Sequence, residues 1–419
     1  MGGVTGCKLA VSEATPDVIR TLGSRLGVSV LFLSGEMTVP ALRGKAPAAS
    51  PDGRTPGLRL GQDDSALRAA LDAAGAAGLS THLVMSNPLA GAAKWHDLLA
   101  HDNGGRSAAD TDREGPTLCP NRPKLLKWLG TAAEELLRTY KPAGLLLDDF
   151  SLGSPDKIDT LFQCWCEVCQ TRAADLGYDA DRIRVGLQGA RSKVAADAPH
   201  TAADLEELGL GQFLEAVGYD TGVLDWVNFR ADSVSACVFE VRQALNKFDP
   251  GLQVTALCKG PTVSLLAGQR RADCLRDTTL VHVYAPVICG ARSGVLATIA
   301  SHARVIRGRL RHSTSSCRPE SVEGRDDGDA RALAFSARLH GCGRLPLPAS
   351  AEQMVRSPDP RLLIASAERE LALTLGSSGE AARWPAIDVH GLPAEVVEQA
   401  ARLVTQSHAE GLLYVGVPG

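Results

Sequence analysis

Short apolar runs alternate with amphipathic stretches along this chain. Five continuous runs predict buried strands, at Ser29–Gly35, Thr81–Met85, Gly144–Phe150, Gln253–Lys259 and Thr279–Val287. Three weaker runs extend the series, at Arg344–Pro348, Ala386–His390 and Leu412–Val417. Val4–Val11 is a possible ninth strand. Continuous runs of this length are typical of parallel strands that helices cover on both faces.

Helix-start signals stand between several of these runs. Thr15 followed by Pro16 is typical of a helix N-terminus, and Asn121 with Pro123 and later Pro393 repeat the pattern. An apolar residue at every third or fourth position follows each signal, so each stretch predicts an amphipathic helix. Strands that alternate with helices are the mark of an α/β fold.

The number of candidate strands predicts a (β/α)₈ TIM barrel, with an open doubly wound sheet as the main alternative. We interpret residues 1–419 as one barrel domain. Residues 160–225 read as polar and helical, and they contain clustered cysteines. They predict a helical insertion after the fourth-strand region. Pro40–Gln62, His101–Leu118 and His312–Asp329 read as long loops.

Composition narrows the class of protein. The chain of 419 residues has 44% hydrophobic residues, a mean hydropathy of −0.03 and a formal net charge of −4. A near-neutral chain is a poor candidate for charge-driven nucleic-acid binding. No apolar run approaches the ~20 residues that span a bilayer, and no basic-then-apolar leader opens the chain. We therefore expect a cytoplasmic protein without nucleic-acid or membrane partners, and leave open whether it forms a homo-oligomer.

Four of the eleven cysteines have metal-ligand spacing. Cys164, Cys166 and Cys169 form a C-x-C-x-x-C cluster, and Cys119 precedes the helix that leads to the Gly144–Phe150 strand. Four thiolates around one ion make a closed, structural Zn²⁺ site with no open catalytic position. An iron–sulfur cluster or four buried free thiols are the alternatives. The remaining cysteines read as ordinary reduced thiols.

The Gly144–Phe150 strand ends in two carboxylates, Asp148 and Asp149. Barrel enzymes carry their chemistry where strands end, and side chains alternate along a strand, so one of the two should face the site. A buried carboxyl there can act as general acid or base. The alternative is a helix cap and a surface ion pair.

Weaker candidates stand at other strand ends and in the following loops. Polar or aromatic side chains that could contact a substrate are Glu36, Asn87, Trp95, Arg230, Lys259, Tyr284 and His390. Asp388 is a second acidic candidate at a late strand. The chain has no G-x-x-x-x-G-K-[ST], H-E-x-x-H or G-x-S-x-G motif. Nucleotide-driven chemistry and a serine hydrolase are therefore disfavoured.

The segment from Cys119 to Cys169 resembles the family-42 β-galactosidases. The shared features are Cys-Pro-Asn-x-Pro at residues 119–123, a helix, a strand ending in acidic residues, and then the cysteine cluster. The resemblance implies a (β/α)₈ barrel, a carbohydrate substrate, and four cysteines on a structural zinc beside the active site. It is specific over about 50 residues and looser over about 140.

The resemblance departs from the family at the chemistry. Where the family's acid/base strand ends in Asp-Asn-Glu, this chain has Asp148, Asp149 and Phe150. The nucleophilic Glu has no evident counterpart, so Glu352 and Asp388 are the candidates for a second carboxylate. The first hypothesis is a glycoside hydrolase with a carboxylate pair. The alternatives are a non-catalytic carbohydrate-binding barrel, and a lyase or isomerase that uses Lys259 and Tyr284.

Overall fold

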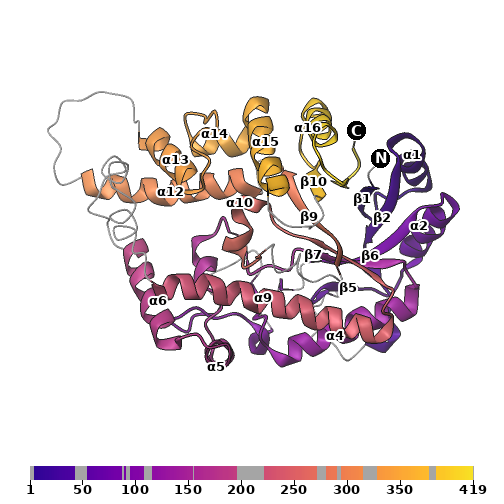
Figure 1. Cartoon of the computed structure of the whole chain (residues 1–419), viewed down its shortest axis with the longest axis horizontal. Coiled ribbons are helices and arrows are strands. Elements are labelled where there is room, and N and C mark those ends of the chain that lie inside the picture. Colours follow the sequence, from indigo (N-terminus) through magenta and orange to yellow (C-terminus); the bar gives the residue numbers. More distant parts are fainter. Residues whose placement is uncertain are drawn as a thin grey trace.

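A computed structural model shows how these elements are arranged (Figure 1). It describes residues 4–42, 54–86, 89–90, 95–107, 116–153, 155–195, 221–270, 280–289, 294–314, 328–376 and 384–418. Candidate Asn87 lies outside the described residues, as do residues 43–53, 108–115 and 315–327 of the predicted loops Pro40–Gln62, His101–Leu118 and His312–Asp329.

Eight parallel strands close into a barrel in the order β1-β11-β10-β9-β8-β7-β6-β2. β1 pairs with both β2 and β11, which closes the ring and excludes the open doubly wound sheet. The strands are β1 (Val4–Ala10), β2 (Val28–Ser34), β6 (Ser80–Ser86), β7 (Gly144–Asp148), β8 (Gln253–Leu257), β9 (Leu280–Ile288), β10 (Trp384–Asp388) and β11 (Gly411–Val415).

The strand prediction is wrong at one place. Arg344–Pro348 is not a strand but an irregular segment before α14, and Val4–Val11 supplies the missing strand as β1. Pro346 and Pro348 have no N–H to donate to a sheet, while Leu345 and Leu347 still pack against the core. An extended apolar segment that cannot pair is easily mistaken for a strand.

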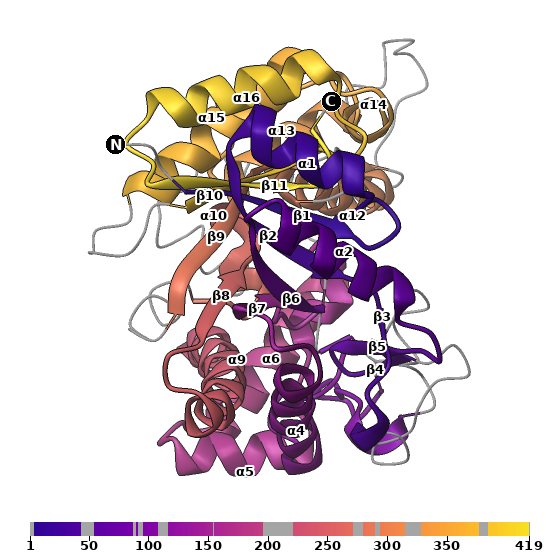
Figure 2. The same ribbon diagram turned by 90° about the vertical axis from the view of Figure 1, so that its right-hand side faces the viewer.

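Helices surround the barrel (Figure 2). α15 and α16 lie on one side of it, and α4, α5 and α9 lie on the opposite side. The helices are α1 (Pro16–Leu26), α2 (Ser65–Ala76), α4 (Pro123–Tyr140), α5 (Glu167–Asp175), α6 (Ala180–Ala195), α9 (Thr221–Phe248), α10 (Pro261–Ser264), α12 (Gly294–Thr314), α13 (Gly328–Leu339), α14 (Ala351–Arg356), α15 (Pro360–Gly376) and α16 (Ala394–Gln406).

The predicted helix starts hold, with small changes of boundary. Thr15 caps α1, because its side chain accepts a hydrogen bond from the N–H of Val18, and Pro16 is the first helical residue. α4 starts at Pro123 with Arg122, not Asn121, at the cap position. Pro393 is itself the cap residue of α16.

Side chains fill the inside of the barrel. Phe32, Leu146, Tyr284, Trp384 and Leu413 are buried there in one apolar cluster. The Tyr284 ring meets Phe32 and Trp384 edge-on, at centroid distances of 6.1 and 5.5 Å. The barrel is therefore a packed core, and chemistry is confined to its ends.

The chain adds structure between the barrel strands. The predicted loop Pro40–Gln62 contains a 3-10 turn (Pro40–Leu42) and strands β4 (Arg54–Thr55) and β5 (Leu58–Leu60). These two strands form a small sheet with β3 (Glu36–Met37), in the order β3-β5-β4. Between the fourth and fifth barrel strands, β7 and β8, lie the 3-10 helix Ile158–Phe162, α5, α6 and α9.

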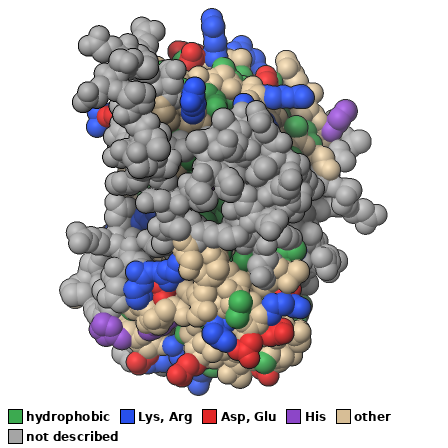
Figure 3. All heavy atoms as spheres, turned by 90° about the vertical axis from the view of Figure 1, so that its left-hand side faces the viewer, with side chains coloured by type: hydrophobic (Ala, Val, Ile, Leu, Met, Phe, Trp, Pro, Cys, Tyr) green, Lys and Arg blue, Asp and Glu red, His purple; other side chains and the backbone are tan. Residues whose placement is uncertain are grey.

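The surface has no single-sign field on the face that Figure 3 displays, because its described acidic and basic side chains are interspersed. A uniformly basic face is the usual footprint of nucleic-acid binding. Among the described residues, no helix combines the length and the apolar character needed to cross a membrane.

Candidate functional site

Two lysines face two aspartates at the end of the barrel where the strands finish. Lys8 on β1 is level in register with Phe32 and Val415 and points inward with them. Its Nζ donates to Asp148 Oδ2 across the barrel at 2.6 Å. Both side chains are mostly buried, with exposed fractions of 18% and 12%. This end of the barrel is called the mouth below.

Asp149 follows β7 in a left-handed conformation, with φ of 55°. Its N–H donates to the carbonyl of Leu257, and its Oδ2 accepts from Lys259 Nζ at 2.7 Å. A non-glycine residue in this conformation stores backbone strain, which is common at functional sites. The turn points Asp149 at the end of the next strand, so each aspartate meets its own lysine.

Gln269 fixes the second pair from behind. This buried side chain accepts from the N–H of Lys259 at 2.7 Å and donates to the carbonyl of Phe150 at 2.9 Å. It therefore joins the segments that follow β7 and β8. Because both the oxygen and the nitrogen of the Gln269 amide make hydrogen bonds, the segments that carry Asp149 and Lys259 are held at a defined separation.

The pairs differ in their electrostatics. Burial raises the pKa of Asp148 above its ordinary value, although the Lys8 ammonium opposes the shift. Burial alone would lower the pKa of Lys259, but the Asp149 carboxylate outweighs it and the pKa is raised. Asp148 can therefore carry a proton more readily than an exposed aspartate, whereas Lys259 stays a cation.

A cavity of about 740 Å³ opens at this mouth. Its wall includes the strand ends Ala10, Ser34 and Ser86, and Ser86 is level in register with Asp148 on the neighbouring strand. The sheet β3-β5-β4 contributes Glu36 and Arg59, which form an ion pair at 3.2 Å. A cavity of this size with mixed lining accommodates a small organic molecule.

Trp95 lines the same cavity and is 3% exposed. Its indole nitrogen has no hydrogen-bond partner among the described residues. The structure thus brings two of the predicted substrate contacts, Glu36 and Trp95, to one cavity beside the aspartates. A buried indole N–H without a partner is an uncommon and costly arrangement in a folded protein.

Asp388 and His390 stand at another point of the mouth. Asp388 ends β10 and is level in register with Val415, which in turn is level with Lys8 on β1. Its Oδ1 lies 2.7 Å from His390 Nδ1. The other ring nitrogen, Nε2, lies 3.8 Å from Glu13 Oε1 in the segment between β1 and α1.

Among the described residues, Glu36 and Trp95 are the predicted site residues that line this cavity. The candidates that end or follow strands at the mouth but are not part of the cavity wall are Asp148, Asp149, Lys259, Asp388 and His390. Three further candidates lie elsewhere. Glu352 is on α14, which packs on α12 and α13, and its exposed carboxylate pairs with Arg356 at 2.8 Å. Tyr284 is fully buried inside the barrel, where burial raises its pKa. Arg230 is on α9 rather than at a strand end, and it donates to the carbonyls of Leu152 and Leu266.

Sequence reasoning missed Lys8, Glu13 and Gln269. Lys8 had a signal, because a lysine inside the apolar run Val4–Ala10 must either face solvent or meet a buried partner. Glu13 directly follows that strand, which is a weaker signal. Gln269 had no such signal, because its role depends on the N–H of Lys259 and the carbonyl of Phe150, which only the fold brings together.

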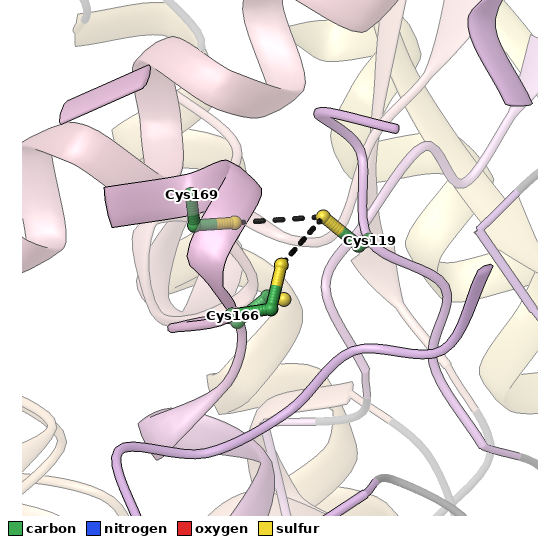
Figure 4. A group of neighbouring side chains, drawn as sticks. Cys119, Cys166 and Cys169 are labelled. Atoms are coloured by element: carbon green, nitrogen blue, oxygen red, sulfur yellow. Dashed lines mark hydrogen bonds between the residues drawn. The ribbon is translucent and has the colours of Figure 1, made fainter. Parts of the chain in front are cut away.

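The four clustered cysteines converge as predicted, and Figure 4 shows the side chains of Cys166 and Cys169 pointing toward Cys119. Cys119 precedes α4, Cys164 and Cys166 lie directly before α5, and Cys169 lies within α5; all four are buried. Their sulfur atoms lie within 4.8 Å of one another. Cys119 Sγ is 3.6 Å from Cys166 Sγ and 3.5 Å from Cys169 Sγ.

These separations fit one tetrahedral ion. Zn–S bonds of about 2.3 Å place two sulfurs roughly 3.8 Å apart. The N–H of His101 donates to Cys164 Sγ and the amide of Asn121 donates to Cys169 Sγ, each at 3.4 Å. Such donors stabilise thiolates around a metal. The donor set therefore suits a four-coordinate metal ion that prefers sulfur ligands.

No protein-family model and no curated protein matches this chain. Similar solved structures include the catalytic domain of a β-amylase from Paenibacillus polymyxa, with 10% identity, a TM-score of 0.49, and coverage of 99% of this chain and 93% of that one. A β-galactosidase from Marinomonas ef1 has 13% identity, a TM-score of 0.40, and coverage of 97% of this chain and 66% of that one.

Family-42 β-galactosidases, which the cysteine segment resembles, are also among the similar structures. Gan42B from G. stearothermophilus has 12% identity and a TM-score of 0.40, and the match covers 98% of this chain and 65% of that one. The chain thus spans about two thirds of the length of these two β-galactosidases. The barrel described above follows from the strand pairing of this chain itself.

Proposed function

We propose that this protein is a glycoside hydrolase that cleaves a glycosidic bond at the barrel mouth. The observation that carries the proposal is the Lys8–Asp148 pair inside the mouth, beside a cavity of about 740 Å³. A buried carboxyl whose pKa is raised is suited to donate a proton to a leaving oxygen. The cavity next to it has room for a sugar ring.

Asp148 is the proposed general acid, and Asp388 is the proposed second carboxylate. They end the fourth and seventh strands of the barrel. Asp148 accepts the hydrogen bond of Lys8, and Asp388 is level in register with Val415, which is level with Lys8. Glycosidases of the common kind need two carboxyl groups on either side of the scissile bond. Asp149 and Lys259 would bind substrate hydroxyls through the carboxylate oxygen and the ammonium protons that their ion pair does not use.

The cysteine centre is proposed to hold a structural Zn²⁺ that braces this region. Cys119, Cys164, Cys166 and Cys169 would all be ligands, which leaves no position for a substrate or water. We also propose that residues 1–419 are one barrel domain, in which residues 160–225 are an insertion after the fourth strand. The ion would tie that insertion to the segment before α4.

A non-catalytic carbohydrate-binding barrel is the second candidate. One observation favours it: both aspartates after β7 are already engaged by lysines. A lyase that forms an imine on Lys259 is less well supported, since an imine needs a neutral amine and the pKa of this lysine is raised.

Hydrolysis of a panel of aryl glycosides by the protein and by Asp148→Asn tests the proposal. Loss of a general acid lowers the rate by about 10²–10⁴-fold, least for the best leaving groups. Asp181→Asn is a matched control, since this aspartate is exposed on α6 and pairs with Arg184. Saturable sugar binding without turnover would favour the second candidate, and neither binding nor turnover would contradict both.

A further inference from the structure

Asp388 and His390 form a hydrogen-bonded couple. Asp388 Oδ1 lies 2.7 Å from His390 Nδ1 and also accepts the backbone N–H of His390 at 3.2 Å. A carboxylate next to Nδ1 keeps the proton of a neutral imidazole on that nitrogen. The lone pair of the ring is then on Nε2, which has no hydrogen-bond partner among the described residues.

Neighbouring residues fix the ring from two other sides. A Cβ added to Gly416 would lie 2.9 Å from His390 Cε1 and 3.0 Å from Nε2, so the ring packs directly on this glycine. Glu13 Oε1 stands 3.8 Å from Nε2, and Glu13 Oε2 accepts the N–H of Ala10 at 3.1 Å. Of the described charged groups, Asp388 and Glu13 are those recorded beside the ring.

The imidazole is also the accessible member of the couple. The side chain of His390 is 58% exposed, compared with 27% for Asp388. Glu13 directly follows residues 10–12, which line the cavity, so the Nε2 side of the ring faces the chain segment at the cavity edge. A base in this position is reached by water more easily than the carboxylate behind it.

We propose that His390, held by Asp388, accepts the proton of the water that attacks the sugar. This assignment rests on the proposed hydrolase function and specifies how Asp388 takes part in it. Asp388 is then a positioning residue and His390 a catalytic one, which revises the roles predicted from the sequence.

The step is a single displacement. The water oxygen bonds to the anomeric carbon while the bond from that carbon to the leaving oxygen breaks. His390 Nε2 takes the water proton, and Asp148 gives its proton to the leaving oxygen; His390 then releases its proton to solvent and Asp148 takes one up. Because no glycosyl-enzyme forms, the anomeric configuration inverts.

Three variants test the assignment on whichever glycoside the protein hydrolyses. His390→Asn can keep the bond to Asp388 but has no basic nitrogen, so kcat should fall by about 100-fold or more, and added imidazole should restore part of it. Asp388→Asn should also lower kcat, and the double variant should be no slower than His390→Asn alone.

His408→Asn is the matched control, because this exposed histidine lies in the turn before β11, at the other end of the barrel. Circular dichroism verifies that each variant folds. His390→Gln is a second variant without the basic ring nitrogen, and its side chain is longer than that of asparagine. NMR of the first product should show the inverted anomer. A retained anomer, or a kcat of both His390 variants within threefold of the parent, would overturn the assignment and leave the proposed function standing. Failure of the parent to hydrolyse any glycoside would overturn both.

Discussion

Adjacent aspartates take different roles because their environments differ. Asp148 is the last residue of β7 and points into the barrel, where burial raises its pKa. Asp149 leaves the strand with φ of 55° and meets Lys259 at the next strand end. One left-handed residue is thus enough to give two neighbouring carboxylates separate partners, as tuned acid/base sites require.

Lys8 stabilises the ionised form of Asp148, so removing it should be costly. In Lys8→Met, the ionised form of Asp148 would lose its cation, and the free energy of unfolding should fall by about 3 kcal/mol at a pH where Asp148 is ionised in the parent. Urea denaturation of parent and variant measures the difference. The pKa of Asp148 should rise further at the same time.

The double variant Lys8→Met/Asp148→Asn is the control for this prediction. It removes both charges, so much of the lost stability should return. Equal destabilisation in the single and double variants would show that the lysine stem, and not its charge, matters for stability.

At the scale of elements, α9 holds the loops behind the mouth. Arg230 is fully buried on this helix, and burial lowers its pKa to about 10. Its guanidinium donates to the carbonyls of Leu152, Thr160 and Leu266, which follow β7 and β8. The position predicted as a substrate contact is therefore a structural link between α9 and the two segments that follow β7 and β8.

Arg230→Met should accordingly affect stability rather than substrate binding. Several buried carbonyls would lose their donor, at roughly 1–3 kcal/mol each, with partial compensation from removing a buried charge. We expect a net loss of about 2–4 kcal/mol in urea unfolding. The KM of the folded variant should remain within about twofold of the parent, whereas a tenfold rise in KM at 10 °C would restore the substrate role.

A histidine pair joins α12, the end of α13 and the loop after β7. His302 Nδ1 lies 3.0 Å from His340 Nε2, and His302 Nε2 lies 3.0 Å from the carbonyl of Pro155. Burial, with help from His302, lowers the pKa of His340 from 6.5 to about 4. Both rings are thus held in their neutral forms between helices.

This pair makes stability depend on pH in a defined direction. Between about pH 6.5 and 4, the unfolded chain binds a proton at His340 that the folded chain does not, so stability falls as the pH falls. The loss is at most about 3 kcal/mol. His340→Gln, which can still donate to His302, should show a smaller loss between pH 7 and 4.5 in chemical denaturation. A matched His408→Gln variant should behave like the parent, and identical pH dependence in all three proteins would contradict the prediction.

At the scale of the whole molecule, the cysteine centre connects segments that are distant in sequence. Cys119 lies 45 positions before Cys164, yet their sulfurs share one cluster of four. The neighbouring sulfurs, and after them burial, raise the pKa of Cys119, so four thiolates are stable together only with a cation. The centre therefore fits a bound metal that fastens α5 to the segment before α4.

Freshly prepared protein should contain about one zinc per chain, measured by mass spectrometry of the metal. Chelation should lower the thermal midpoint, since a metal bound only by the folded state stabilises it. Cys166→Ser should lose most of the zinc, and Cys289→Ser, a half-buried cysteine outside the cluster, should keep it. Zinc well below one per chain, or iron in its place, would contradict the assignment.

Local patterns in the sequence determined the element types and the cysteine cluster. The first eight apolar runs predicted seven of the eight barrel strands. A strand that is buried on both faces is a continuous apolar run, which is a strong signal within a few residues of sequence. The cysteine spacing predicted the cluster for a similar reason: three of its four cysteines lie within six residues. Only the fourth, Cys119, required an argument about the fold.

Tertiary structure decided which polar residues meet at the mouth. Closing the barrel places Lys8 opposite Asp148 and buries Tyr284, and it leaves Glu352 on an outer helix. Ion pairs such as these join residues far apart in the chain, so no local pattern specifies them. The sequence thus determined that carboxylates would end a barrel strand. The three-dimensional arrangement decided which cation each carboxylate faces, because the charges around it depend on strand register across the barrel.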